Sequence, residues 1–221
     1  MDTVAVIDFE TTGISPDAGA RATEIAAVLV RDGRVVDRYQ SLMNAGAWVP
    51  PFIEELTGIT NEMVRAAPPA ARVMREVADF VGAHPLVAHN ASFDRRFWDA
   101  ELARVRRSRQ QEFACTMLLA RRIYPHAPNH KLGTLVRFAG LPVAGRSHRA
   151  MADAEMAASL LSKLEEELVR RFALGAVTHE LLRVIQGAAR GELGGCVARF
   201  AMTQSGGQRQ SHFSAKPWAR T

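Results

Sequence analysis

Two carboxylates stand one residue apart near the start of the chain, Asp8 and Glu10, directly after an apolar run at residues 4–7. The run is too short for a helix and rich in β-branched residues, so it predicts a buried strand. Alternate residues of a strand face the same side, which places both carboxylates together. Such like charges repel unless a cation lies between them, and hard oxygen ligands suit magnesium or manganese. The pair alone is a weak signal, because a solvated strand end has the same sequence.

Two further acidic residues stand in contexts that place them near the first pair. Asp94 follows the short apolar run at residues 86–88 and falls in the first turn of a predicted helix, at the carboxyl edge of the sheet. Asp153 follows His148 by five residues, so that the histidine stands in a loop and the carboxylate near the start of a long predicted helix.

The elements that must position these residues follow from periodicity and turn signals. Apolar residues 25–30, an Asp32-Gly33 turn and Val35-Val36 predict a β-hairpin, since glycine tolerates the positive φ of a tight turn. We also expect strands at residues 86–88 and 112–116, an N-cap at Ser92, and helices at about residues 70–82, 92–105, 132–138 and 149–173. A strand, a hairpin and then alternating helices and strands predict an α/β domain, with helices on the faces of a mixed sheet.

Composition is that of a soluble globular protein without a membrane partner. The 221 residues are 48% hydrophobic, and no apolar run approaches the roughly 20 residues of a membrane helix. The two cysteines have no metal-ligand spacing, which favours a reduced, cytoplasmic setting. We expect a domain at 1–174, a helical extension at 175–202 and a flexible basic tail at 203–221, with a linker at 205–208. Residues 175–221 carry six basic and two acidic residues, a net +4 of the total +5, which suits nucleic acid or a solvated tail equally.

The whole set, Asp8/Glu10, Asp94 and His148-x-Ala150-x-x-Asp153, resembles the DEDDh branch of the DEDD (DnaQ-like) 3′–5′ exonucleases. The nearest likeness is to the proofreading epsilon subunit of bacterial DNA polymerase III, and three segments resemble its signatures: residues 7–13, 56–60 and 88–94. The resemblance covers about residues 3–170. It implies a ribonuclease H-like fold, with a mixed five-stranded sheet flanked by helices.

The resemblance also implies roles. Asp8, Glu10 and Asp153 hold one divalent cation, Asp94 supports a second, and His148 takes the proton of the attacking water. Mg²⁺ is the expected ion, with Mn²⁺ able to substitute, and the product is a nucleoside 5′-monophosphate. The substrate is a single-stranded or frayed 3′ end, and a DNA polymerase subunit is a candidate partner. The implied substrate contacts are Thr11, Thr12, Gly13, Leu56, Thr57, Ile59 and Phe93; plain core packing is an alternative for Phe93.

Alternatives stay open at this stage. An exoribonuclease of the oligoribonuclease or ribonuclease T kind has the same metal ligands, and a non-catalytic nucleic-acid-binding module is a third possibility. No clamp-binding peptide is evident after residue 174, so a free-standing enzyme competes with a polymerase subunit. We interpret Glu24 as a structural anchor, His89 as a satisfied structural histidine, and Trp98 and Cys115 as core. The arginines at 104, 106, 107 and 109 suit a solvated helix end better than a phosphate-binding patch.

Overall fold

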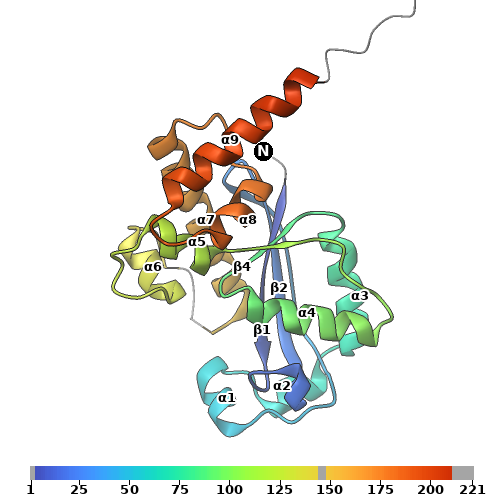
Figure 1. The fold of residues 1–221 in the computed structure, drawn as a ribbon. Helices are drawn as coiled ribbons and strands as arrows, with labels where there is room; N and C mark the ends of the chain where they lie inside the picture. The colour runs from blue at the N-terminus through green and yellow to red at the C-terminus, as the bar shows by residue number, and fades with distance from the viewer. Residues whose placement is uncertain (1–2, 144–147, 211–221) are drawn as a thin grey trace, which may run out of the picture.

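A five-stranded mixed sheet forms the centre of the computed structural model, which describes residues 3–143 and 148–210 (Figure 1). The strand order is β3-β2-β1-β4-β5. Strands β1, β2 and β3 are antiparallel neighbours, while β4 runs parallel to β1 and β5 parallel to β4. The strands are β1 Val4–Thr11, β2 Ala22–Arg31, β3 Arg34–Leu42, β4 Leu86–Ala88 and β5 Phe113–Cys115. This arrangement confirms the predicted mixed five-stranded sheet.

The predicted hairpin joins β2 to β3. Asp32 and Gly33 have φ of 50° and 72°, so both central residues lie in the left-handed region. A two-residue turn of this kind matches the right-handed twist of the strands that it connects. The long strands that follow leave β1 in the middle of the sheet, where both of its faces are covered.

Alternate residues of β1 belong to two different cores. Val4 and Val6 pack in the core that α7 (Ala150–Phe172) covers, whereas Ala5, Ile7 and Phe9 pack in the core on the other face. The second core is closed by α3 (Ala70–Val81) and α4 (Ser92–Arg104). The remaining elements before α7 are η1 Pro16–Ala18, α1 Pro51–Thr57, α2 Asn61–Ala66, α5 Thr116–Ile123 and α6 Leu132–Phe138. By this alternation Asp8 and Glu10 face the side of α7.

A small separate core supports α1 and α2 at one end of the molecule (Figure 1). It consists of Val49, Ile53, Ile59 and Val64. Gly58 ends α1 at φ 72°, and the Thr60 hydroxyl accepts a hydrogen bond from Met63 N–H to cap α2. This lobe therefore has a fixed shape beside the end of β1.

The two C-terminal helices pack against the same core as α7. They are α8 (His179–Gly187) and α9 (Leu193–Gln210), and their buried apolar side chains join the α7 core. The predicted linker at 205–208 is wrong, because α9 continues through these residues. Of the tail predicted at 203–221, residues 211–221 lie outside the described residues. None of the helices described is long and apolar enough to cross a membrane.

Candidate active site

Strand β1 delivers the first two carboxylates at its carboxyl end. Asp8 lies opposite Ala26 of β2 and Glu10 opposite Glu24, and the register shifts directly after Glu10. Asp8 is half-buried and Glu10 is buried, with both on the face that α7 covers. The two carboxylates thus lie at the point where the sheet passes from core to surface.

Helix α4 carries the third carboxylate to the same place. Asn90 turns the chain after β4 with a φ of 63°, and α4 begins two residues later. Asp94 lies in the first turn, is only 2% exposed, and accepts a hydrogen bond from the Phe9 N–H at 3.1 Å. This bond ties α4 to the residue between Asp8 and Glu10, so the third carboxylate is fixed relative to the first two. The predicted N-cap is wrong, because Ser92 is the first helical residue and its side chain does not cap the helix.

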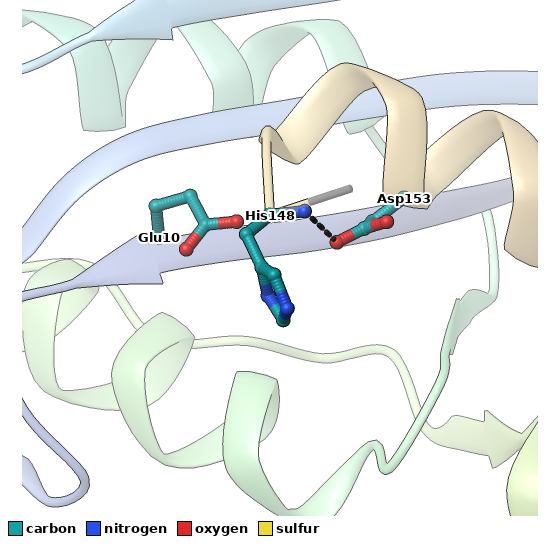
Figure 2. A group of neighbouring side chains, drawn as sticks. All are labelled: Glu10, His148 and Asp153. Carbon is teal, nitrogen blue, oxygen red and sulfur yellow. Dashed lines mark hydrogen bonds between the residues drawn. The ribbon is translucent and has the colours of Figure 1, made fainter. Parts of the chain in front are cut away.

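Helix α7 brings the fourth carboxylate and the histidine. Asp153 lies in its first turn, and its Oδ2 accepts a hydrogen bond from the His148 N–H at 3.1 Å. Figure 2 shows the His148 side chain between Glu10 and Asp153, in front of β1. One ligand atom from each of these three residues lies within 4.8 Å of the other two. Residues more than 130 positions apart are therefore close enough to share one ion.

An open cleft of about 370 Å³ holds all five predicted catalytic residues. Five of the predicted substrate-contacting residues also line it: Thr11, Gly13, Leu56, Thr57 and Phe93. Three more residues at its wall had no assigned role in the sequence, Ile14, Ile53 and Asn90, and His89, which we interpreted as structural, also lines it. Ile14 is 83% exposed, which is unusual for an isoleucine, and its only sequence signal is its place directly after Gly13. No lysine or arginine lines the cleft within the described part of the chain.

Two predicted substrate contacts do not reach the cleft wall. Ile59 is fully buried in the small core under α1, because Gly58 turns the chain inward. The Thr12 hydroxyl accepts a hydrogen bond from Arg21 N–H, which holds the loop after β1 to the start of β2. Thr57 reaches the wall, but its hydroxyl already donates to the Ile53 carbonyl and accepts from Ile59 N–H. Its role there is to shape the wall.

Burial and mutual repulsion make the four carboxylates hard to ionise without a cation. Burial, and after it the charge of the nearby Asp153, raise the pKa of Glu10 to about 8. Burial also raises the pKa of Asp94 to about 7, although the Phe9 N–H acts against this shift. The pKa values of Asp8 and Asp153 are raised for the same primary reason, burial. Oxygen ligands in this condition suit a hard divalent cation, which would neutralise their charge.

The residues that we interpreted as structural have structural partners. His89 Nδ1 lies 2.9 Å from the Thr116 hydroxyl and Nε2 lies 3.1 Å from the His130 carbonyl, and burial lowers the pKa of His89 to about 4. A neutral imidazole with both nitrogens engaged supports the wall of the cleft. Trp98 and Cys115 are buried, as predicted. Arginines 104, 107 and 109 form ion pairs with Glu101, Asp79 and Asp99.

The fold and the site together have the arrangement of the DEDDh exonucleases, four clustered carboxylates and one histidine. The chain belongs to the exonuclease family, which it matches over residues 5–161. It is similar to PolC-type DNA polymerase III of Oceanobacillus iheyensis, at 37% identity over 171 residues, and of Bacillus subtilis, at 35% over 173 residues. Each match covers 77% of this chain and 12% of the relative, so the chain corresponds to a small part of those polymerases.

Solved structures share this fold. Exonuclease X in complex with 5′ overhanging duplex DNA aligns with a TM-score of 0.66 at 29% identity, over 83% of this chain and 99% of that one. The zinc-bound complex of E. coli exonuclease I with single-stranded DNA aligns at 0.71 and 20% identity, over 83% of this chain and 43% of that one. The nuclease domain of 3′hExo, a DEDDh family member bound to rAMP, aligns at 0.65 and 19% identity, over 77% and 92%. At these identities the last two show the fold alone.

Proposed function

We propose that the protein is a metal-dependent 3′–5′ exonuclease that releases nucleoside 5′-monophosphates from single-stranded or frayed DNA ends. The observation that carries the proposal is the meeting of Asp8, Glu10, Asp94, Asp153 and His148 in one cleft. Such a set has no evident role in folding. Buried carboxylates that repel one another destabilise a fold unless a ligand compensates them.

The residues fit a pair of divalent cations, Mg²⁺ or Mn²⁺. Glu10 and Asp153 present oxygens close enough to share one ion, and Asp8 lies beside Glu10 on β1. Asp94, which the Phe9 N–H holds beside Asp8 and Glu10, would support a second ion. When bound, two such ions activate a water and stabilise the leaving oxygen in an in-line displacement at phosphorus.

The chain itself supplies proton transfer and orientation. His148 is exposed at the cleft, where its imidazole would act as the general base toward the attacking water. The Thr11 hydroxyl donates to the Gly13 carbonyl at 2.7 Å, which stiffens the loop that would face the terminal nucleotide. Leu56 is exposed and also lines the cleft. Phe93 packs on Phe97 at a centroid distance of 5.0 Å and also lines the cleft, so it joins core and site.

DNA is the preferred substrate in this proposal, with proofreading beside a DNA polymerase as its setting. Relatives are DNA polymerases, and Exonuclease X was solved with a DNA duplex. A cytoplasmic setting is part of the proposal, in keeping with two buried, unpaired cysteines. An exoribonuclease is the second candidate, since the same fold occurs, at 19% identity, in a 3′-exonuclease that recognises the histone mRNA stem-loop. The metal site does not separate them, because the difference lies in contacts around the 2′-hydroxyl.

One comparison tests direction, sugar preference and catalysis together. DNA and RNA oligonucleotides labelled at the 5′ end, with free or blocked 3′ ends, are incubated with Mg²⁺ or Mn²⁺. We expect a ladder that shortens from a free 3′ end, release of mononucleotides, and faster loss of DNA. Internal cuts, or trimming of a 3′-blocked strand, would contradict the direction. Binding without turnover would favour the non-catalytic module, and faster loss of RNA the exoribonuclease.

A further inference from the structure

An ion pair between a buried carboxylate and a half-buried arginine lies close to the catalytic residues, and neither partner lines the cleft. Glu24 of β2 is 1% exposed, and Arg149 approaches it with two nitrogens: Nε at 3.1 Å from Oε2 and Nη2 at 2.9 Å from Oε1. The Ala150 N–H donates to Oε2 at 3.1 Å, and Gln40 Nε2 of β3 donates to Oε1 at 2.8 Å. One carboxylate therefore joins three elements, β2, β3 and the start of α7. We name Glu24, Gln40 and Arg149 the Glu24 clamp.

The Glu24 clamp holds the part of the chain that carries His148 and Asp153. Arg149 is the N-cap of α7 and has no side-chain cap of its own, while Ala150 is the first helical residue. The first N–H groups of a helix lack partners within the helix, and a carboxylate at this end is also favoured by the helix dipole. Glu24 thus caps α7 from a neighbouring strand. The cap fixes the backbone at Ala150, two residues after His148 and three before Asp153.

The same geometry sets the conformation of His148. Its φ is 60°, an uncommon conformation for a non-glycine residue. Its N–H reaches Asp153 Oδ2 in this conformation, and the Asp153 N–H in turn donates to the Arg149 carbonyl at 3.1 Å. Asp153 is therefore hydrogen-bonded to the backbone of both His148 and Arg149. Displacement of Arg149 would therefore move the histidine and the carboxylate together.

We propose that Arg149 and Glu24 are positioning residues for catalysis: the clamp fixes the start of α7 so that His148 and Asp153 meet Glu10 across the cleft. The expected effect on kcat rests on the proposed function, whereas the positioning of His148 and Asp153 rests on the contacts of the Glu24 clamp alone. Displacements of about 1 Å at a reacting group can lower a rate by about 10²-fold. Loss of outer partners of a metal site commonly weakens metal affinity or activity by about 10–100-fold.

The test compares Arg149→Ala, Arg149→Lys and Glu24→Gln with a matched control. The control is Arg38→Ala, which removes another ion pair between the sheet and α7, Arg38 Nε to Glu155 Oε1 at 2.6 Å, on the exposed surface. Each full-length variant is assayed for kcat and KM on a 5′-labelled oligonucleotide, for Mn²⁺ affinity without nucleic acid, and for Tm.

We expect Arg149→Ala to lower kcat by about 10–100-fold and to weaken Mn²⁺ binding, with KM within about twofold of the parent. Arg149→Lys should restore only part of kcat, because an ammonium cannot make the two parallel hydrogen bonds. Arg38→Ala should match the parent protein. If Arg149→Ala does not fold because it leaves the buried Glu24 carboxylate without its cation, Arg149→Lys still decides the matter, since it keeps a positive charge beside Glu24.

Three results would overturn the proposal. Unchanged kcat and Mn²⁺ affinity in Arg149→Ala would show that the clamp does not position the site. Full recovery in Arg149→Lys would show that charge alone matters, and a rise in KM alone would assign Arg149 to substrate binding. If the parent protein cleaves no oligonucleotide, the proposed function fails, and the Mn²⁺ affinities still decide whether the clamp positions the site.

Discussion

Neutralising Glu10 should change how the stability of the metal-free protein depends on pH. Burial and the neighbouring carboxylates raise the pKa of Glu10 from 4.5 in the unfolded chain to about 8 in the folded one. The folded protein therefore binds a proton that the unfolded chain has already lost. Stability from this group is complete below about pH 4.5 and disappears as pH rises through about 8. The sign is opposite to that of ordinary acid denaturation.

The magnitude follows from the two pKa values of Glu10. Between about pH 6.5 and about pH 8, this carboxyl alone should lower the free energy of unfolding by about 1.6 kcal/mol. Glu10 is 8% exposed, so little of this energy is lost to solvent screening. His89 acts in the opposite direction, because burial lowers its pKa to about 4, and it stays constant when only Glu10 is changed. The useful quantity is therefore the difference between the parent and Glu10→Gln.

Urea unfolding followed by circular dichroism, with a chelator present, measures this difference at both pH values. From about pH 6.5 to about pH 8, we expect the free energy of unfolding to fall by about 1.6 kcal/mol more in the parent than in Glu10→Gln. Glu62→Gln, an exposed change on α2 outside the cleft, serves as the control and should follow the parent. Added Mn²⁺ should raise the free energy of unfolding of the parent most strongly at the higher pH, where the ligands are more easily deprotonated. Equal losses in the parent and Glu10→Gln would refute the electrostatic account of the cleft.

The remaining predictions concern catalysis and binding. Asp8→Asn and Asp153→Asn should each abolish cleavage of a labelled oligonucleotide while the circular dichroism spectrum stays native; near-normal turnover in either variant would contradict the metal assignment. His148→Ala should lower kcat by about 10²–10⁴-fold and spare Mn²⁺ affinity, as single-turnover assays and metal titration would report. Removal of residues 203–221, which contain three basic and no acidic residues, should weaken oligonucleotide binding at low salt only. Affinity that is unchanged at every salt concentration would exclude an electrostatic role for this segment.

Local signals in the sequence predicted the elements that carry the site. The apolar run before Asp8 and the Asp32-Gly33 turn each depend on a few neighbouring residues, and the structure confirms the strand and the hairpin. The spacing from His148 to Asp153 predicted a loop followed by a helix, and α7 begins between them at Ala150. Such features survive because tertiary contacts reinforce the local preference.

The incorrect predictions concern α9 and Ile59, whose structures depend on tertiary packing. Gly191 lies in the break between α8 and α9, whereas α9 begins at Leu193 and continues through Gly194 and Gly195. Leu193, Cys196 and Val197 bury one side of this helix against the α7 core, which outweighs the low helix propensity of glycine. Ile59 shows the same limit at the site. The motif at residues 56–60 correctly predicted that Leu56 and Thr57 lie at the cleft. It did not show that the chain turns at Gly58 and buries the Ile59 side chain in the small core.

Glu10 and Glu24 show most clearly what the chain order alone does not contain. They lie opposite each other on β1 and β2, where like charges destabilise a sheet, and both are buried. Burial alone raises the pKa of Glu24 too, but the hydrogen bonds from Arg149, Gln40 and Ala150 outweigh it and lower that pKa. Among the residues that the structure describes, none donates such a hydrogen bond to the Glu10 side chain, and its pKa rises to about 8. The carboxylate that the protein leaves unsatisfied is the one free to bind a cation. The difference between the proposed ligand Glu10 and the anchor Glu24 therefore arises from a contact that spans 125 positions of the chain.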